Sequence, residues 1–296
     1  MLFVYRILIN FTLILSPAIL IYRLFHKKED PIRFKEKYCF FSKKKRKGKL
    51  IWFHGASVGE ILSVIPILEK LEKDKKISQI LVTSNTLSSS NIIQKYKFKK
   101  LTHQFFPVDN NYLSKKFLDY WKPSSAFFID SEIWPNTIIN LKKRKIPITL
   151  LNARITKKTF NRWMFFSKFA NHIFNHFNLC LSSNTETKKF LQKLGAKKIK
   201  FFGNLKFSQF ENEKIFINKS FKRFIRSKKT WCASSTHNTE EVLCGLVHKE
   251  LKKKYKNLLT IIIPRHIERV GKIKKDLSSL GLKTHFHEPK TKIEKD

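Results

Sequence analysis

The stretch "KLIWFHGASVGEILSVIPILEKL", residues 49–71, joins an apolar run to an amphipathic run through a short loop of small residues. The first run, residues 50–53, has the composition of a buried strand, and the second, from Glu60 to Lys73, has the apolar spacing of a helix. A strand, a tight loop and a helix in this order open a βαβ unit. The stretch therefore predicts a parallel sheet, with Glu60 just beyond the carboxyl end of a strand.

The same alternation continues along the first two thirds of the chain. Further strands are predicted at residues 77–84, 125–129, 147–151, 179–183 and 198–203, and helices at 87–97, 113–120, 137–143, 157–177 and 185–194. This alternation indicates a parallel sheet covered on both faces, where ligands bind beyond the carboxyl ends of the strands. The polar residues that follow the strands should therefore meet at one edge: Glu60, Thr83, Ser84, Asp130 and Asn152.

A second alternating run follows residues 208–227, which break the rhythm and are interpreted as a linker. Its predicted strands are 230–235, 258–264 and 282–286, and its predicted helices are 240–254 and about 268–280. Three strands are few for an independent α/β domain, since such domains usually hold about 100 residues or more. The fold class expected is α/β, with two Rossmann-like doubly wound domains of which the second is incomplete.

The N-terminal residues 1–25 are mostly apolar and are predicted to form a membrane helix. About 20 apolar residues span a bilayer, although Asn10, Ser16 and Pro17 interrupt this run. We find no small-residue cleavage site of a signal peptide, and the basic run at 43–49 favours the cytoplasm for the chain that follows. The expectation is a single anchor or an in-plane membrane helix, with a buried first helix as the alternative.

The composition is strongly basic, with 61 Lys and Arg against 22 Asp and Glu and a formal net charge of +39. Such a charge attracts polyanions, but the Lys-, Ile- and Asn-rich composition of an AT-rich coding sequence explains it equally well. Basic residues are spread along the chain, without a helix-turn-helix, zinc-finger or RNP-like segment, so no nucleic-acid partner is expected. Four cysteines without CxxC spacing argue against a zinc site or a disulfide scaffold.

Six short segments place polar or conformationally special residues beside the predicted strands. They are HGASVGE (54–60), DSEIWPN (130–136), LNARIT (151–156), GNLKF (203–207), SSTHNTEE (234–241) and PRHIER (264–269). In this order they resemble the signature segments of the 3-deoxy-D-manno-octulosonic acid (Kdo) transferases of lipid A biosynthesis, over most of the chain.

The resemblance implies an inverting glycosyltransferase of the B-type fold that uses no metal and no cofactor. Residues 26–207 would bind the acceptor, a lipid A precursor (lipid IVA). Residues 228–296 would bind the donor, CMP-Kdo. The enzyme would act on the cytoplasmic face of the bacterial inner membrane and contact its lipid.

The resemblance also assigns roles to single residues. Glu60 would be the general base, and Asp130 and Lys206 would stabilise the transition state, with Asp130 standing where the family usually has Glu. The segment matches further imply that substrate is bound by Ser57, Gly59, Glu132, Asn152, Arg154, Pro264 and Arg265. Glu132 could in addition pair with Arg154.

The matching segments run to about residue 269, and the family's second domain would continue past the end of this chain. The family's Gly-rich, His-Asn-containing donor loop does not occur in this sequence, so a fragment, a frameshifted product or a chain completed by a second chain is expected. An inactive remnant that binds only acceptor or membrane remains the alternative function. His266 is interpreted as structural, and His285 and His287 as exposed residues of a strand and not a metal pair.

Overall fold

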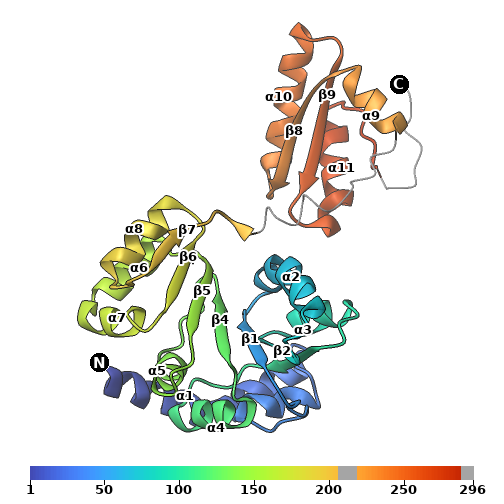
Figure 1. Ribbon diagram of the computed structural model, residues 1–296. Coiled ribbons are helices and arrows are strands. Elements are labelled where there is room, and N and C mark those ends of the chain that lie inside the picture. Colours follow the sequence, from blue (N-terminus) through green and yellow to red (C-terminus); the bar gives the residue numbers. More distant parts are fainter. Residues whose placement is uncertain (206–218, 288–296) are drawn as a thin grey trace. The chain divides into compact units, whose positions relative to one another are not determined.

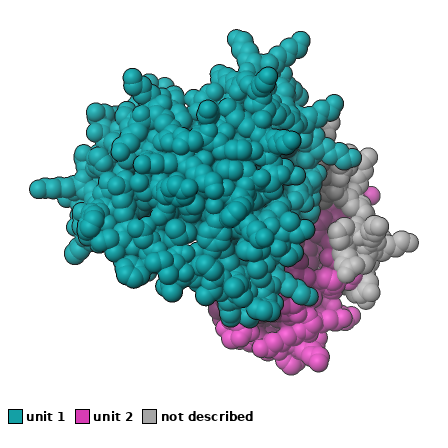
Figure 2. All heavy atoms as spheres, turned by 90° about the horizontal axis from the view of Figure 1, so that it is seen from below, with its two compact units in different colours: residues 1–213 teal, residues 214–296 magenta. Residues whose placement is uncertain are grey.

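The computed structural model describes residues 1–205 and 219–287 (Figure 1). The chain forms two compact units, residues 1–213 (unit 1) and 214–296 (unit 2), which are coloured separately in Figure 2. Part of the predicted linker, residues 208–218, lies outside the described residues. The remainder begins with helix α9 (Lys219–Arg226).

The described part of unit 1 contains one seven-stranded parallel sheet, in the order β3-β2-β1-β4-β5-β6-β7. Its strands are β1 (Leu50–His54), β2 (Gln79–Ser84), β3 (Leu101–Phe105), β4 (Ser125–Ile129), β5 (Ile148–Ala153), β6 (Leu179–Ser182) and β7 (Ile199–Phe201). The predicted parallel sheet is confirmed, and β3 is an addition to it. Because β2 and β4 lie on opposite sides of β1, the strand order reverses at β1, where ligands bind in such sheets.

Helices pack on both faces of this sheet because successive strand residues point to opposite sides. Trp52 and Phe128 belong to one hydrophobic cluster, and Phe53 and Ile129 belong to the other. The helices of unit 1 are α1 (Leu2–Phe25), α2 (Val58–Lys73), α3 (Leu87–Gln94), α4 (Asn111–Trp121), α5 (Pro135–Lys143), α6 (Lys157–Met164), α7 (Ser167–Phe174) and α8 (Thr185–Lys193). The single helix expected over 157–177 is therefore two helices.

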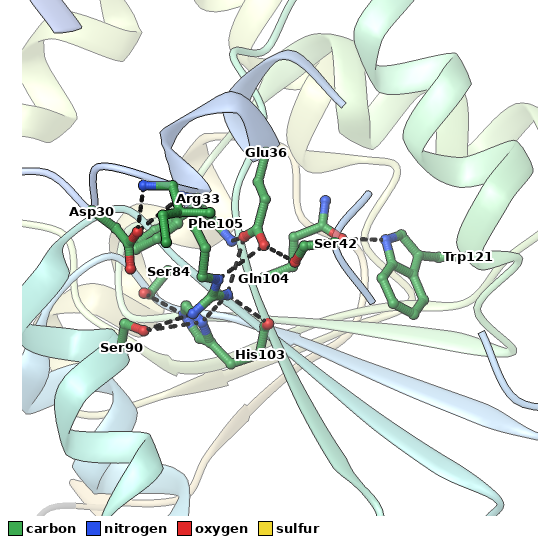
Figure 3. A network of polar contacts seen from close by, with 11 residues as sticks. Asp30, Arg33, Glu36, Ser42, Ser84, Ser90, His103, Gln104, Phe105 and Trp121 are labelled. Carbon is green, nitrogen blue, oxygen red and sulfur yellow. Dashed lines mark hydrogen bonds and ion pairs between the residues drawn. The ribbon is translucent and has the colours of Figure 1, made fainter. Parts of the chain in front are cut away.

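The edge strand β3 is protected by the short 3₁₀ helix η1 (Arg33–Tyr38), as Figure 3 shows. The Glu36 carboxylate accepts the backbone N–H of Phe105 at 2.8 Å and the Arg33 guanidinium at 3.0 and 3.1 Å. Arg33 also donates to the carbonyl of His103 at 2.8 Å. Burial, together with the Arg33 charge, lowers the pKa of His103 to about 3. The imidazole of His103 is therefore neutral. The network satisfies polar groups that an uncovered edge would expose.

Glu36→Gln is expected to lower the free energy of unfolding by about 2 kcal/mol. The substitution removes the charge that compensates the largely buried Arg33 but keeps one acceptor. Urea unfolding followed by tryptophan fluorescence measures the change. Glu69→Gln, at an exposed position on α2, is the control and should change little. Equal stability of the two variants would show that the network contributes nothing.

Unit 2 contains, in its described part, a parallel pair of strands, β8 (Lys229–Thr236) and β9 (Leu258–Pro264). With them are α10 (Glu240–Lys254), η3 (Ile267–Arg269) and α11 (Val270–Ser279). The prediction of a third strand at residues 282–286 is wrong, because residues 282–287 have no regular secondary structure. His285 and His287 are thus not in a strand, and His287 stacks on Phe221 at 4.7 Å.

Candidate active site at the ends of β1, β4 and β5

The Glu60 carboxylate folds back onto the loop that precedes α2. Its Oε2 accepts the backbone N–H of Ala56 at 2.6 Å, and its Oε1 accepts the Ser57 hydroxyl at 3.0 Å. Ser57 Oγ in turn accepts the N–H of Glu60 at 3.3 Å, which completes a capping box at the start of α2. Carboxylate oxygens have four lone-pair sites, so Glu60 keeps capacity to accept a further proton.

The electrostatic surroundings of Glu60 favour its protonated form. Burial raises the pKa of Glu60, and the nearby Glu132 and Asp130 charges raise it further. The hydrogen bonds from Ala56 and Ser57 oppose this effect without cancelling it. A raised pKa brings a carboxylate closer to the range in which it accepts and releases protons near neutral pH.

Gly55 allows the loop to approach Glu60 closely. A Cβ at this position would lie 3.0 Å from Ile129 Cδ1 and 3.1 Å from Glu60 Cβ. A larger residue would therefore push against the side chain of Glu60 and against the sheet. The absence of a side chain at Gly55 therefore leaves the space that the Glu60 side chain and Ile129 occupy.

His54, Glu132 and Trp134 form a polar cluster next to this loop. His54 is fully buried at the end of β1, and its Nδ1 lies 2.9 Å from Thr83 Oγ1. Its Nε2 lies 3.1 Å from Glu132 Oε2, which also accepts the Trp134 indole N–H at 2.9 Å. The Trp134 indole N–H also lies 3.0 Å from His54 Nε2, so the three side chains are in mutual contact. The cluster fixes Glu132 on the side of β4 that faces β1.

Asp130 and Asn152 end neighbouring strands in the left-handed conformation, with φ of 55° and 51°. Asp and Asn tolerate this conformation better than other residues with a Cβ. Asn152 Nδ2 donates to Asp130 Oδ1 at 2.5 Å, and Asn152 Oδ1 accepts the N–H of Leu205 at 3.0 Å. Asn152 therefore links the end of β4 to the segment that leads toward Lys206, which itself lies outside the described residues.

The structure brings several predicted site residues together at one edge of the unit 1 sheet. They are Ser57, Gly59, Glu60, Asp130, Glu132 and Asn152. The suggested partner of Glu132 was wrong: among the described contacts, Glu132 bonds His54 and Trp134 and not Arg154, whose side chain is exposed. His54 and Trp134 were missed as members of this cluster, although both lie within the quoted sequence segments.

Unit 2 carries the other predicted binding residues, Pro264 and Arg265, at the carboxyl end of β9. Pro264 ends that strand, and the N–H of the exposed Arg265 donates to the carbonyl of Thr236 at 3.0 Å. Nearby, Glu241 accepts the Thr236 hydroxyl at 2.8 Å and the Arg269 guanidinium at 2.8 Å. These contacts join the ends of β8 and β9 to α10 and η3.

An apolar groove of about 580 Å³ lies near the Glu60 loop in unit 1. It is lined by Ile21, Leu24, Phe25, Lys27, Glu29, Pro31 and Leu87. Leu87 begins α3, and Ser89 of the same helical turn donates to the carbonyl of Ala56 at 3.3 Å. One wall of the groove is therefore formed by the helix that contacts the Glu60 loop.

Comparison with known protein families and sequences gives a consistent result. A family model described as 3-deoxy-D-manno-octulosonic-acid transferase (kdotransferase) matches residues 32–209. A 3-deoxy-D-manno-octulosonic acid transferase of Rickettsia bellii is 34% identical over 86% of this chain and 61% of its own length. The Haemophilus influenzae transferase of the same name is 27% identical over 74% of this chain and 52% of its own length. The chain thus spans between half and two thirds of the length of these relatives.

Solved structures share the fold at low sequence identity. A UDP-GlcNAc 2-epimerase from Neisseria meningitidis aligns with a TM-score of 0.55 and 15% identity, over 78% of this chain and 69% of its own. A glycosyltransferase from Rickettsia africae aligns with a TM-score of 0.52 and 11% identity, over 80% and 66%. The predicted fold class, α/β of the B-type glycosyltransferases, is confirmed.

Proposed function

The chain belongs to the 3-deoxy-D-manno-octulosonic acid (Kdo) transferase family, and on this premise we propose that it transfers Kdo from CMP-Kdo to a lipid A precursor in lipopolysaccharide biosynthesis. The main structural support is the place of Glu60. It lies beyond β1, where the strand order reverses, with a raised pKa beside Asp130 and Glu132. Such a position suits a carboxylate that accepts a proton from a bound hydroxyl.

The proposed reaction is a single displacement that inverts the anomeric carbon. The acceptor hydroxyl oxygen attacks this carbon of Kdo while Glu60 takes the hydroxyl proton, and the bond to the CMP phosphate oxygen breaks with its electron pair. CMP is a good leaving group, so one carboxylate is enough. Lys206 would neutralise the charge that develops on the phosphate, and Arg265 would bind the same group.

The other site residues are proposed to position the substrates. Asp130, fixed by Asn152, would stabilise the transition state from the end of β4. Ser57 and Gly59 would allow the acceptor sugar to approach the loop, and the exposed Arg154 would contact an anionic group of the substrate. Glu132 would act mainly by setting the charge around Glu60.

A lipid acceptor agrees with the apolar groove and with the apolar helix α1. The groove has about 580 Å³ of space between the C-terminal turns of α1 and Leu87, enough for part of an acyl chain. Helix α1 contains, among the described residues, the one segment long and apolar enough to cross a membrane. We propose a location on the cytoplasmic face of the bacterial inner membrane.

A second candidate function is a remnant that binds acceptor or membrane without transferring Kdo. It is favoured by the small core of unit 2, where Ile273 and Leu277 are the buried apolar side chains among the described residues. Parallel strands are normally covered on both faces. Calorimetric titration of the purified chain with CMP, and separately with a tetraacyl lipid A precursor in detergent, distinguishes the candidates. Binding of both supports the enzyme, whereas binding of the precursor alone supports the remnant.

His54→Gln is expected to lower the rate of Kdo transfer by about 10- to 100-fold, since a 1 Å displacement near the chemistry can cost about 100-fold. The variant loses the imidazole that fixes Glu132 and thereby alters the charge beside Glu60. The acid limb of the pH–rate profile should shift together with the rate. A lower rate with an unchanged pH profile would mean that His54 is needed only for folding.

A further inference from the structure

Helix α1 is held against the rest of unit 1 by polar contacts along nearly its whole length. At its start, the Tyr5 hydroxyl donates to Asp109 at 2.7 Å and Arg6 Nε donates to Asn136 at 3.0 Å. Further along, Asn10 Oδ1 accepts a hydrogen bond from Asn110 Nδ2 at 2.7 Å. Ser16 Oγ lies 2.8 Å from the Tyr38 hydroxyl, and Arg23 forms an ion pair with Glu29 at 2.6 Å. From Tyr5 to Arg23 this series covers about 27 Å of helix.

The partners of these contacts are mostly buried polar side chains of the rest of unit 1. Asn111 in α4 and Asn136 in α5 both receive hydrogen bonds from Arg6, and Leu2 and Leu13 pack on one of the two hydrophobic clusters. Figure 1 shows α1 alongside α4 and α5. If α1 crossed a bilayer, these contacts would have to break or the polar loops around them would have to enter hydrocarbon, where unsatisfied polar groups cost several kcal/mol each.

The opposite side of α1 carries a lengthwise stripe of exposed apolar side chains. The stripe consists of Val4, Leu8, Phe11, Leu15, Ile19 and Tyr22, which are 46–62% exposed. Spacings of three and four residues place such side chains on one face of a helix. The helix therefore has one face bonded to protein and one exposed apolar face, on which the Tyr22 ring contacts the His26 ring at 4.2 Å.

Two neighbouring features fit a lipid surface. The turn between α6 and α7 exposes Phe165 by 81% and Phe166 by 41%, and the Tyr5 and Phe169 rings lie 6.3 Å apart, which places α7 beside the start of α1. At the other end of α1, the exposed residues 26–28 read His-Lys-Lys. Basic side chains beside an apolar stripe are typical of helices that lie in the interface of an anionic bilayer.

We infer that α1 lies in the plane of an anionic membrane surface and does not cross it. The stripe enters the boundary between head groups and acyl chains, Phe165 and Phe166 insert beside it, and the polar contacts hold unit 1 on the cytoplasmic side. This inference refines the proposed membrane location but is independent of Kdo transfer.

Spin-label depth measurements test this orientation. Cys232 and Cys244 are replaced by Ser, and single nitroxide labels are placed at Val4, Phe11 or Tyr22 of the full chain. The chain is bound to vesicles of phosphatidylethanolamine and phosphatidylglycerol. An in-plane helix gives three similar, shallow depths, whereas a spanning helix gives a deep central label and two shallow ends. A label at the exposed Lys189 on α8 should remain in water.

A charge variant provides the second test. Phe11→Glu combined with Leu15→Glu should weaken vesicle binding at least about 10-fold and leave the melting temperature unchanged, because both side chains are exposed. A spanning depth profile would overturn the in-plane orientation alone. No binding of the wild-type chain to the vesicles would overturn the membrane location as well, whatever the result of a Kdo-transfer assay.

Discussion

Glu60→Gln is expected to reduce the rate of Kdo transfer by about 10²- to 10⁴-fold, the usual contribution of a general base. Gln has nearly the same shape and can keep the bond from the Ala56 N–H, but it does not accept the acceptor's proton. The measurement is the initial rate of transfer from CMP-Kdo, supplied by a generating system, to a tetraacyl precursor. Glu69→Gln, an exposed position on the same helix, is the control and should keep the wild-type rate.

The pH dependence of the wild-type rate of Kdo transfer should reflect the titration of Glu60. A base acts in its deprotonated form, so the rate falls as the pH drops through its pKa. Because burial and the neighbouring Glu132 and Asp130 raise the pKa of Glu60, this fall should lie above the ordinary Glu value of about 4.3. Glu132→Gln removes one of the charges and should move the fall to lower pH. An unmoved profile would show that Glu60 does not titrate in this step.

Asp109→Ala is expected to have the largest effect on stability, a loss of about 3–5 kcal/mol in the free energy of unfolding, because buried donors that lose their acceptor cost about 1–3 kcal/mol each. Asp109 is 1% exposed and accepts the N–H groups of Asn136 and Thr137, each at 2.9 Å. It also accepts the Thr137 hydroxyl at 2.6 Å and the Tyr5 hydroxyl at 2.7 Å. Trp134, at the start of α5, supplies no side-chain cap, so Asp109 caps this helix from another segment.

Urea unfolding followed by tryptophan fluorescence measures this loss. Asp119→Ala is the matched control, because Asp119 forms an exposed pair with Arg144 at 2.6 Å that should contribute only about 0–1 kcal/mol. The Asp109 variant should also weaken the attachment of α1, since Tyr5 loses its acceptor. Similar stabilities of the two variants would contradict the role assigned to Asp109.

The helices and strands of unit 1 could largely be predicted because local patterns of apolar residues indicate which side chains are buried. Strand β3 could not, since His103 and Gln104 interrupt the apolar pattern. Both side chains are buried by distant partners: Arg33 from η1 for His103, and Trp121 from α4 for Gln104. The opposite error occurred at 282–286, where an alternating local pattern suggested a strand but residues 282–287 have no regular secondary structure.

The meeting of Glu60, Asp130 and Asn152 followed from one physical rule, namely that the carboxyl ends of parallel strands share an edge. The partner of Glu132 did not follow, because it depends on the strand order. Since β4 pairs with β1, Glu132 meets His54 at the end of β1, whereas Arg154 follows β5 on the other side. Sequence segments thus indicated which residues gather but not which of them touch.

The most direct test of the central claim is mass spectrometry of lipid A precursors from bacteria depleted of their own Kdo transferase. The wild-type chain or its Glu60→Gln variant would be expressed in them at matched levels. We predict that the precursor gains Kdo in cells with the wild-type chain and remains unmodified in cells with the variant. Unmodified precursor in both, with the wild-type chain folded and abundant, would contradict Kdo transfer by this chain.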